Sequence, residues 1–392
     1  MSAAAPLGTS TSGEGVLHVM WSLRIGGAER ALYQLILGQR TAGMEVGLLV
    51  ASELGFYGET LEAEGVVVER LGLRRGYDAL ASLRARSIFA RWPVVHFHVA
   101  EPTLMAVAAA TDGRRYYTHR AGAFDYSLRR RLRYLAAGLI LRHRFHGIVG
   151  NTCQAAEAAS RLFRVSRREI GVLYNGIDWS LLRAERRPEE VREELALTAN
   201  HVVFGATGNL RDWKRLDIAI RALQQTRSGA SLVIVGDGPE RLNLERLARD
   251  LSVSHRVRFT GTKPNVADYL QVFDAFVLTS GPQESFGNSV VEAMGYGLPT
   301  IVMSDGGGLT EHVYHEQTGI VAKDVRDLVS WMDRLGAAGD LRATLGARAR
   351  EQVRARYSVE RMVRAYGALY AGTRSLSSAR SDTGFRAAAE AD

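Results

Sequence analysis

This sequence of 392 residues has very little cysteine and no long apolar runs. Its single cysteine, Cys153, excludes an internal disulfide, which fits the reducing interior of a cell. No stretch approaches the roughly 20 apolar residues that a membrane-spanning helix needs. Residues 1–15 are small and polar, without the basic and apolar regions of a signal peptide. We therefore expect a cytoplasmic protein.

Lysine is nearly absent as well. Of the 50 basic residues, only Lys214, Lys263 and Lys323 are lysines, and the others are arginines. The net charge of +8 thus comes almost wholly from arginine. This skew most simply reflects a GC-rich coding sequence, so we expect no nucleic-acid partner. Where arginine is the habitual basic residue, a lysine marks a position that favours a compact point charge. Lys214 is such a position, since it lies inside a motif described below.

The length suits two domains, and 46% apolar residues is typical of globular proteins. Apolar runs alternate with amphipathic stretches, which predicts α/β domains with mostly parallel, doubly wound sheets. Strands are expected at 16–23, 45–50, 66–70, 94–98, 114–119, 147–151 and 170–174, and helices around 80–92, 104–111, 128–143 and 154–163. The predicted organisation is a disordered tail at 1–15, a first domain at 16–183, a linker with a short helix at 184–200, a second domain at 201–355, a last helix at 356–371 and a disordered tail at 372–392.

One stretch of the second domain, residues 281–299, combines two carboxylates with a helix start. Glu284 and Glu292 lie eight residues apart, after a predicted buried strand at 274–280. A helix is expected to begin at Asn288, so that the backbone N–H groups around Phe286 and Gly287 are free to bind an anion. Carboxylates on both sides of such donors can accept hydrogen bonds from sugar hydroxyls. The pattern therefore indicates a nucleotide-sugar site; the alternative is a Glu292 that faces solvent on a surface helix.

The segment E-S-F-G-N-S-V-V-E resembles the E-x7-E signature of retaining glycosyltransferases of the family-4 type, which have the GT-B fold. The resemblance extends over residues 16–371. It implies two doubly wound, Rossmann-like domains facing a cleft, with the acceptor on the first, the nucleotide-sugar on the second, and the last helix crossing back to the first. It also implies that Glu284 holds hydroxyls of the transferred sugar and Glu292 the ribose. Between them, Ser285, Phe286, Gly287 and Asn288 are implied to bind the donor.

Basic residues resembling the family's diphosphate-binding pair follow a predicted strand at 201–207. Family members commonly have G-R-L-x-x-x-K-G, whereas here Asn209 takes the arginine position and Arg215 replaces the last glycine. Arg211 stands two residues later, so Arg211 and Lys214 are expected to hold the diphosphate as a planar fork and a point charge. The alternative is a pair of solvated charges. Lys263, after a later strand, is a candidate contact to the nucleotide base.

Two further similarities to the family lie in the first domain. The G-G-A-E loop resembles one that closes over the donor diphosphate, which makes Gly26 and Gly27 donor-binding candidates. His119 resembles a histidine that contacts the transferred sugar near its anomeric centre, and together with Glu284 it is the catalytic candidate. Arg120 replaces the aspartate that usually follows this histidine, so what orients the imidazole is open; Asp125 is one candidate.

No metal ion or cofactor is expected. His96 and His98 share one face of a strand, but an H-x-H pattern alone does not make a zinc site, and hydrogen-bonded histidines near a strand end are the simpler interpretation. No D-x-D motif occurs, which is the usual metal-binding motif of the other large glycosyltransferase fold. Arg211, Lys214 and helix amides are expected to offset the diphosphate charge instead.

The predicted reaction transfers a sugar from a nucleotide-diphosphate donor, UDP-linked by expectation, to an acceptor hydroxyl with retained configuration. A natural-product aglycone and a cell-surface glycan or lipid-linked intermediate are both open as acceptors. An epimerase or phosphorylase on the same scaffold, and a catalytically idle binding subunit, remain as alternatives. The arginine-rich segment 127–146 reads either as an ordinary surface helix or as a contact to anionic lipid at the inner membrane face or to an anionic acceptor.

Overall fold

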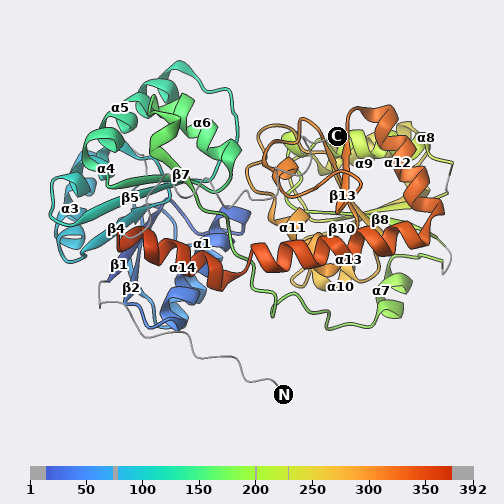
Figure 1. The fold of residues 1–392 in the computed structure, drawn as a ribbon, viewed down its shortest axis with the longest axis horizontal. Helices are drawn as coiled ribbons and strands as arrows, with labels where there is room; N and C mark the ends of the chain where they lie inside the picture. Colours follow the sequence, from blue (N-terminus) through green and yellow to red (C-terminus); the bar gives the residue numbers. More distant parts are fainter. Residues whose placement is uncertain (1–14, 74–77, 199–200, 228, 373–392) are drawn as a thin grey trace, which may run out of the picture. The chain divides into compact units, whose positions relative to one another are not determined.

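The computed structural model describes residues 15–73, 78–198, 201–227 and 229–372 (Figure 1). Contacts divide the chain into two compact units. The first comprises Met1–Arg120, Asp125–Gly176 and Val359–Asp392, and the second comprises Ala121–Phe124 and Ile177–Ser358. The tails predicted at 1–15 and 372–392 lie, apart from Gly15 and Gly372, outside the described residues, as do the last two residues of the predicted linker.

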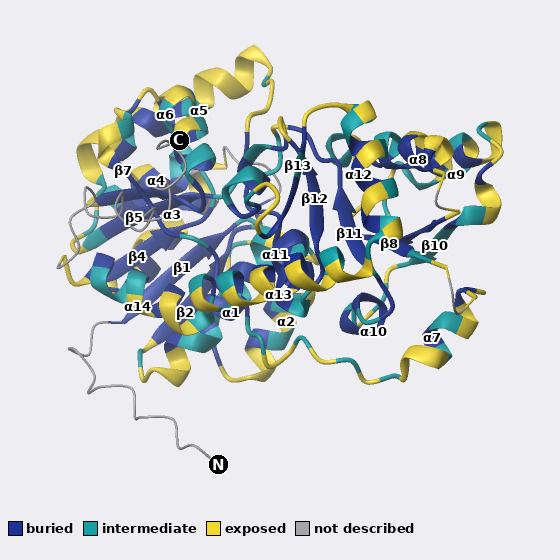
Figure 2. Cartoon of the chain, turned by 45° about the vertical axis from the view of Figure 1, so that its right-hand side comes forward, coloured by how far each residue is buried: buried dark blue, intermediate teal, exposed yellow. Residues whose placement is uncertain are grey.

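The first unit is built on a seven-stranded sheet in the order β3-β2-β1-β4-β5-β6-β7, with every neighbouring pair parallel. The strands are β1 (Val16–Met20), β2 (Val46–Val50), β3 (Val67–Arg70), β4 (Val94–Phe97), β5 (Arg114–His119), β6 (Gly147–Gly150) and β7 (Ile170–Val172). The central strands are buried, because helices cover both faces of a parallel sheet, and they form dark blue layers in Figure 2.

Two sets of helices cover this sheet, each over its own apolar core. On one face pack α1 (Gly27–Thr41), α2 (Phe56–Ala63) and α14 (Val359–Tyr370). On the other pack α3 (Ala79–Ala90), α4 (Pro102–Ala109), α5 (Leu128–Arg144) and α6 (Cys153–Phe163), and a 3-10 turn, η1 (Arg167–Glu169), precedes β7. The last helix of the described chain therefore lies beside the first, α14 against α1.

The second unit has a six-stranded parallel sheet in the order β10-β9-β8-β11-β12-β13. Its strands are β8 (Val203–Thr207), β9 (Ser231–Val235), β10 (Val257–Gly261), β11 (Ala275–Leu278), β12 (Thr300–Met303) and β13 (Gly319–Ala322). Its helices are α7 (Pro188–Glu194), α8 (Leu216–Gln225), α9 (Arg241–Asp250), α10 (Ala267–Leu270), α11 (Asn288–Tyr296), α12 (Val325–Ala337) and α13 (Gly339–Arg356), with the 3-10 turns η2 (Asp212–Lys214), η3 (Ser254–Arg256) and η4 (Gly307–Glu311).

In this unit α8 packs with α9 and α12, whereas α11 packs with α10 and α13. Two doubly wound parallel sheets confirm the predicted α/β class. Within the described ranges, no helix has both the length and the apolar run that a bilayer crossing requires.

Candidate functional site

The second sheet has a topological switch point between β8 and β11, because the chain builds outward from β8 to β9 and β10 and then from β11 to β12 and β13. Open α/β sheets bind ligands at the carboxyl ends of the strands at such a point. The loop after β8 carries Arg211 and Lys214, and the loop after β11 carries Glu284. The two loops meet directly, since the Gly281 N–H donates to the Trp213 carbonyl over 2.8 Å.

Lys214 and Glu284, 70 residues apart in the sequence, form an ion pair at this edge. The Lys214 Nζ lies 2.6 Å from Glu284 Oε2, and both side chains are only 13% exposed. The Ser280 hydroxyl donates to the same carboxylate oxygen over 3.1 Å. A largely buried lysine and glutamate are thus held together by two loops as an ion pair.

The loop that carries Glu284 ends in a turn that positions the start of α11. Gly287 has φ +69°, and a Cβ there would lie 2.1 Å from Leu309 Cδ2, so both conformation and space require glycine. Ser285, Phe286 and Asn288 around it are buried. The predicted helix start at Asn288 is therefore correct, and the first amides of α11 stand at the switch-point edge.

A histidine that the sequence did not single out fixes this turn. His312 Nε2 lies 2.9 Å from the Phe286 carbonyl, and Nδ1 lies 2.8 Å from the Tyr357 hydroxyl. The His312 ring also packs on the Phe286 ring at 4.6 Å between centroids. Burial lowers the pKa of His312 to about 3, so the imidazole is neutral and acts as a fixed hydrogen-bonding clamp. Only tertiary contact marks His312 itself, because its partners Phe286 and Tyr357 lie 26 and 45 residues away in the sequence.

Glu292, one turn inside α11, is 5% exposed. The alternative that it faces solvent on a surface helix is therefore wrong. A buried carboxylate next to a helix start is the placement that a ligand-holding or structural role requires.

Arg211 and Arg215 occupy different environments although both follow β8. Arg211 is exposed and lies over the Trp213 ring at 5.7 Å, leaving its guanidinium in reach of a ligand. Arg215, in the position of the family's glycine, has φ +47°. Its guanidinium donates to the Thr279 and Ser280 carbonyls and to both oxygens of Asp305. Arg215 thus fastens the two loops to each other.

Lys263 already has strong partners elsewhere in the second unit. Its ammonium lies 2.9 Å from Glu194 Oε1 and 5.3 Å from the centre of the Tyr269 ring. These interactions raise the pKa of Lys263, first through the hydrogen bond with Tyr269. A contact to a nucleotide base remains a prediction for this residue, and it would have to compete with Glu194.

Residues 121–124, which follow β5 in the sequence, belong to the second unit by their contacts. The Ala123 N–H donates to the Pro282 carbonyl over 3.0 Å, and a Cβ on Gly122 would lie 2.5 Å from that same carbonyl oxygen. The Phe124 ring meets the Trp213 ring edge-on at 5.6 Å. This short segment therefore lies directly on the loops that carry Lys214 and Glu284, a contact that sequence spacing cannot reveal.

In the first unit, Gly26 and Gly27 cap and begin α1, at the carboxyl end of β1. Gly26 is extended, and a Cβ there would lie 2.2 Å from Glu29 Oε2, so the loop backbone lies close to that carboxylate. Desolvation by burial raises the pKa of Glu29. Donor binding by Gly26 and Gly27 remains a prediction.

His119, the last residue of β5, is 5% exposed and packs edge-on against the Phe163 ring. Its Nδ1 lies 3.0 Å from the Tyr117 hydroxyl, and burial lowers its pKa to about 4. Its Nε2 is buried without a hydrogen-bond partner. Tyr117 orients the imidazole, not Asp125, which pairs instead with Arg131 at 3.1 Å on the surface.

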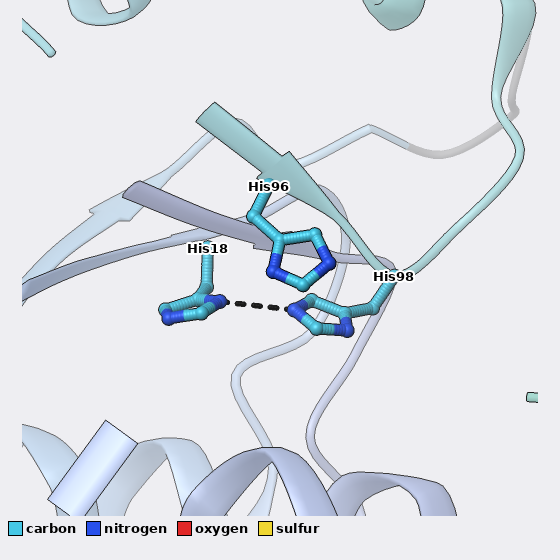
Figure 3. A group of neighbouring side chains, drawn as sticks. All are labelled: His18, His96 and His98. Atoms are coloured by element: carbon cyan, nitrogen blue, oxygen red, sulfur yellow. Dashed lines mark hydrogen bonds between the residues drawn. The ribbon is translucent and has the colours of Figure 1, made fainter. Parts of the chain in front are cut away.

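A cluster of three buried histidines lies deeper in the same unit, made of His96 and His98 with His18 from the neighbouring β1 (Figure 3). Their nearest ring nitrogens lie within 4.8 Å of one another, close enough to hold a metal ion. However, all six ring nitrogens already have partners. His18 bonds His98 and Gln39, His96 bonds Tyr370 and Thr118, and Arg120 Nε lies 3.4 Å from His98 Nδ1. An ion would have to break these bonds beside a cationic guanidinium.

Two family models together match most of the chain. The model described as "Glycosyl transferases group 1" matches residues 188–352, and the model described as "Glycosyltransferase Family 4" matches residues 25–181. The boundary between the two matches falls near the crossing from the first unit to the second.

Curated relatives match over shorter stretches. N-acetyl-alpha-D-glucosaminyl L-malate synthase of Bacillus anthracis is 30% identical over 207 residues, which are 52% of this chain and 54% of that protein. Lipopolysaccharide core biosynthesis glycosyltransferase LpsD of Rhizobium meliloti (strain 1021) is 34% identical over 202 residues, 51% of this chain and 57% of that protein. The chain thus spans about half the length of the curated relatives it matches.

Solved structures match over nearly the whole chain. Anabaena HepE in complex with UDP superposes with a TM-score of 0.81 at 20% identity, over 92% of this chain and 100% of that chain. WaaG, a glycosyltransferase involved in lipopolysaccharide biosynthesis, gives a TM-score of 0.72 at 16% identity, over 91% and 100%. These similarities confirm the predicted GT-B fold.

Proposed function

Because this chain belongs to the glycosyl transferases group 1 family, we propose that it moves a sugar from a nucleotide-diphosphate sugar to an acceptor hydroxyl. The observation that carries the proposal is the largely buried ion pair of Lys214 and Glu284 at the switch point of the second sheet. UDP is the proposed nucleotide, since HepE was solved with UDP. The proposed acceptor is an intermediate of cell-surface glycan or natural-product assembly, in line with the name of LpsD.

The proposed diphosphate site joins Lys214, exposed Arg211 and the first amides of α11. A point charge, a planar fork and helix N–H groups together neutralise a diphosphate, so the proposed reaction needs no metal ion or cofactor. The ammonium of Lys214 donates to Glu284 Oε2. Binding of the donor would draw the ammonium toward the phosphates and free the carboxylate for sugar hydroxyls.

The other predicted site residues complete this arrangement. Glu284 is proposed to hold the transferred sugar and Glu292 the ribose, with Ser285, Phe286 and Asn288 forming the wall between them. The Gly26–Gly27 loop is proposed to approach the diphosphate. Lys263 is proposed to contact the base, for which its ammonium would have to leave Glu194.

The acceptor hydroxyl is proposed to attack the anomeric carbon on the same face from which the diphosphate leaves, so that the anomeric configuration is retained. The bond between the anomeric carbon and the phosphate oxygen breaks, and Lys214 and Arg211 stabilise the charge left on the diphosphate. The acceptor oxygen bonds to the anomeric carbon, and its proton passes to the departing phosphate oxygen. His119, neutral and with Nε2 unpartnered, is proposed to contact the reacting sugar. NMR of the first-formed product checks retention.

Calorimetric titration of UDP tests the site. We expect Lys214→Ala to weaken UDP binding by at least about tenfold, since it removes a charge-assisted contact and leaves Glu284 to repel the diphosphate. Lys323→Ala is the matched control, an exposed lysine on another loop, and should bind UDP like the unchanged protein. Equal UDP affinity in all three proteins would refute the diphosphate assignment.

We also propose that the protein is cytoplasmic and that α5 rests on the anionic inner face of the membrane. Its leucines Leu128, Leu132, Leu135 and Leu139 are 73%, 57%, 40% and 61% exposed and follow helical spacing along one stripe. Exposed arginines flank this stripe, and the helix is largely yellow in Figure 2. Apolar side chains that enter the lipid headgroup layer, together with neighbouring basic residues, complement an anionic lipid surface. An ordinary surface helix would not expose four leucines in one stripe.

Co-sedimentation with vesicles tests this contact. We expect the protein to bind vesicles containing phosphatidylglycerol and to be released by salt, and Leu132→Glu with Leu139→Glu to abolish binding. Leu242→Glu, which changes a leucine that is 72% exposed in the second unit, is the control and should still bind. Binding that survives the α5 double substitution would contradict the proposal.

A further inference from the structure

Arg120 stands where the family resemblance predicts an aspartate, and its guanidinium is incompletely bonded. Nη1 donates to the Asn175 amide oxygen and Nε lies 3.4 Å from His98 Nδ1. Nη2 is buried and has no hydrogen-bond partner. Arg120 is partly buried, and among the described residues no carboxylate forms an ion pair with it.

The surroundings of Arg120 leave its charge uncompensated. Burial lowers the pKa of His18 to about 4 and holds those of His96 and His98 well below their usual value, with Arg120 adding to each shift. The three imidazoles are therefore neutral. Glu29 is the acid whose pKa responds to Arg120, but its carboxyl forms no ion pair with the guanidinium within the described chain, and burial raises its pKa.

A chain of hydrogen bonds fixes the direction of the guanidinium, and Figure 3 draws its link between His98 and His18. An arginine N–H can only donate, so His98 accepts at Nδ1 and carries its proton on Nε2. That proton is donated to His18 Nδ1 over 2.9 Å, and His18 in turn donates from Nε2 to the Gln39 side-chain oxygen over 2.7 Å. A continuous series of hydrogen bonds thus leads from Arg120 through His98 and His18 to Gln39, and it fixes the tautomers of both histidines.

Arg120 also lies at the edge of the sheet where ligands bind. It directly follows β5, while His98 follows β4 and Asn175 follows β7 by a few residues, so all three stand at the carboxyl ends of parallel strands. The first sheet has its own switch point between β1 and β4, the two strands that carry the histidines. A planar cation with a spare donor at this edge matches an oxyanion and repels a metal ion.

We propose that Arg120 binds an oxyanion, a carboxylate or a phosphate, carried by the acceptor. This inference rests on the proposed glycosyl transfer and adds a chemical class for the acceptor. The oxyanion would accept from Nη2, so that the guanidinium gains the acid partner that the protein itself does not supply. His98 and Asn175 are positioning residues that hold the fork for it.

Inorganic phosphate is the probe, titrated into the full chain that is first saturated with UDP, with chloride added to equal ionic strength as a reference. UDP blocks the diphosphate site of the second unit, so a remaining response reports another anion site. We expect phosphate to raise the melting temperature in the millimolar range. Arg120→Gln should weaken this phosphate binding by at least about tenfold, and Arg120→Lys by less, because lysine keeps the charge and loses the fork.

The controls separate this proposal from the proposed function. Arg84→Gln, an exposed arginine of the first unit, should respond to phosphate like the unchanged protein. Lys214→Ala should lose UDP affinity and, without UDP, keep the Arg120-dependent phosphate response. A response unaffected by Arg120→Gln would overturn the proposal. A response that depends on Arg120 but vanishes in saturating UDP would assign the oxyanion to the donor diphosphate and likewise overturn it.

A second measurement does not depend on how the variants fold. Crystals of the unchanged protein grown with UDP and soaked in tungstate should show anomalous density within hydrogen-bonding distance of Arg120. Tungstate density elsewhere, with none at Arg120, would contradict the inference.

Discussion

Arg215 adopts a backbone conformation that glycine usually takes, with φ +47°. For a residue with a side chain, the left-handed conformation costs about 1–2 kcal/mol. The structure shows the compensation, since the Arg215 guanidinium joins the Thr279 and Ser280 carbonyls to Asp305. Replacing the family's glycine by Arg215 therefore costs backbone strain and adds hydrogen bonds that join two loops of the site.

Two substitutions separate these effects. Arg215→Ala removes the guanidinium and keeps the strain, whereas Arg215→Gly removes both. We expect both variants to be less stable than the unchanged protein, and the alanine variant to be about 1 kcal/mol less stable than the glycine variant. Urea unfolding followed by circular dichroism measures the difference. An alanine variant as stable as the unchanged protein would show that the loop-to-loop bonds contribute nothing.

Buried neutral histidines make stability depend on pH. Burial lowers the pKa of His312 to about 3 and those of His18 and His119 to about 4. The unfolded chain binds these protons from about pH 6.5 downward, whereas the folded chain does not. Their contribution is therefore complete above about pH 6.5 and is lost as the pH falls toward the folded values.

We expect the unfolding free energy to fall steeply between about pH 6 and pH 4, and His312→Gln to make that fall shallower. Each buried histidine contributes a slope of up to about 1.4 kcal/mol per pH unit in this range. Urea titrations at several pH values measure both slopes. The same slope with and without His312 would show that its imidazole is protonated in the folded protein as readily as in the unfolded one.

At the scale of elements, the close packing of α14 against α1 depends on Gly38. A Cβ on Gly38 would lie 2.6 Å from Val359 Cγ1 and 2.8 Å from Val363 Cγ2. Both valines are stiff at their branched carbon and cannot swing away easily. Gly367 in α14 is the counterexample, because a Cβ there would meet nothing within 4 Å.

The two glycines should respond in opposite directions. Gly38→Leu is expected to destabilise the first unit by about 1–3 kcal/mol through overpacking. Gly367→Ala is expected to stabilise it by about 0.5–1 kcal/mol, since alanine favours the helix and has room. Thermal unfolding of both variants beside the unchanged protein is the measurement. A Gly38→Leu variant as stable as the unchanged protein would mean that α14 is loosely seated.

Most elements could be predicted because the determining signal is local. Buried parallel strands are short apolar runs, and the helices between them repeat their apolar residues at helical spacing, so their alternation predicts a parallel, doubly wound sheet. The start of α11 at Asn288 was predictable in the same way, from a glycine turn before an amphipathic run. Local sequence patterns therefore predict where helices and strands lie, and with them the loops that carry the site residues.

At the scale of the whole molecule, what the sequence could not show are contacts between distant segments. His18 joins His96 and His98 only because β1 and β4 are neighbours in register. His312 reaches Phe286, and residues 121–124 reach the loop of Glu284, across gaps that no motif spans. Arg120 departs from the family pattern in the sequence, but its unpartnered Nη2 is visible only in three dimensions.

The central claim is that Lys214 holds the diphosphate and Glu284 the sugar of one nucleotide-sugar. The most direct measurement compares the affinities of UDP and UDP-glucose for the unchanged protein, Lys214→Ala and Glu284→Gln. We expect the lysine substitution to weaken both ligands and the glutamate substitution to weaken UDP-glucose at least about tenfold more than UDP. If Glu284→Gln changed the two affinities equally, or neither, the carboxylate would not hold the sugar and the account would be contradicted.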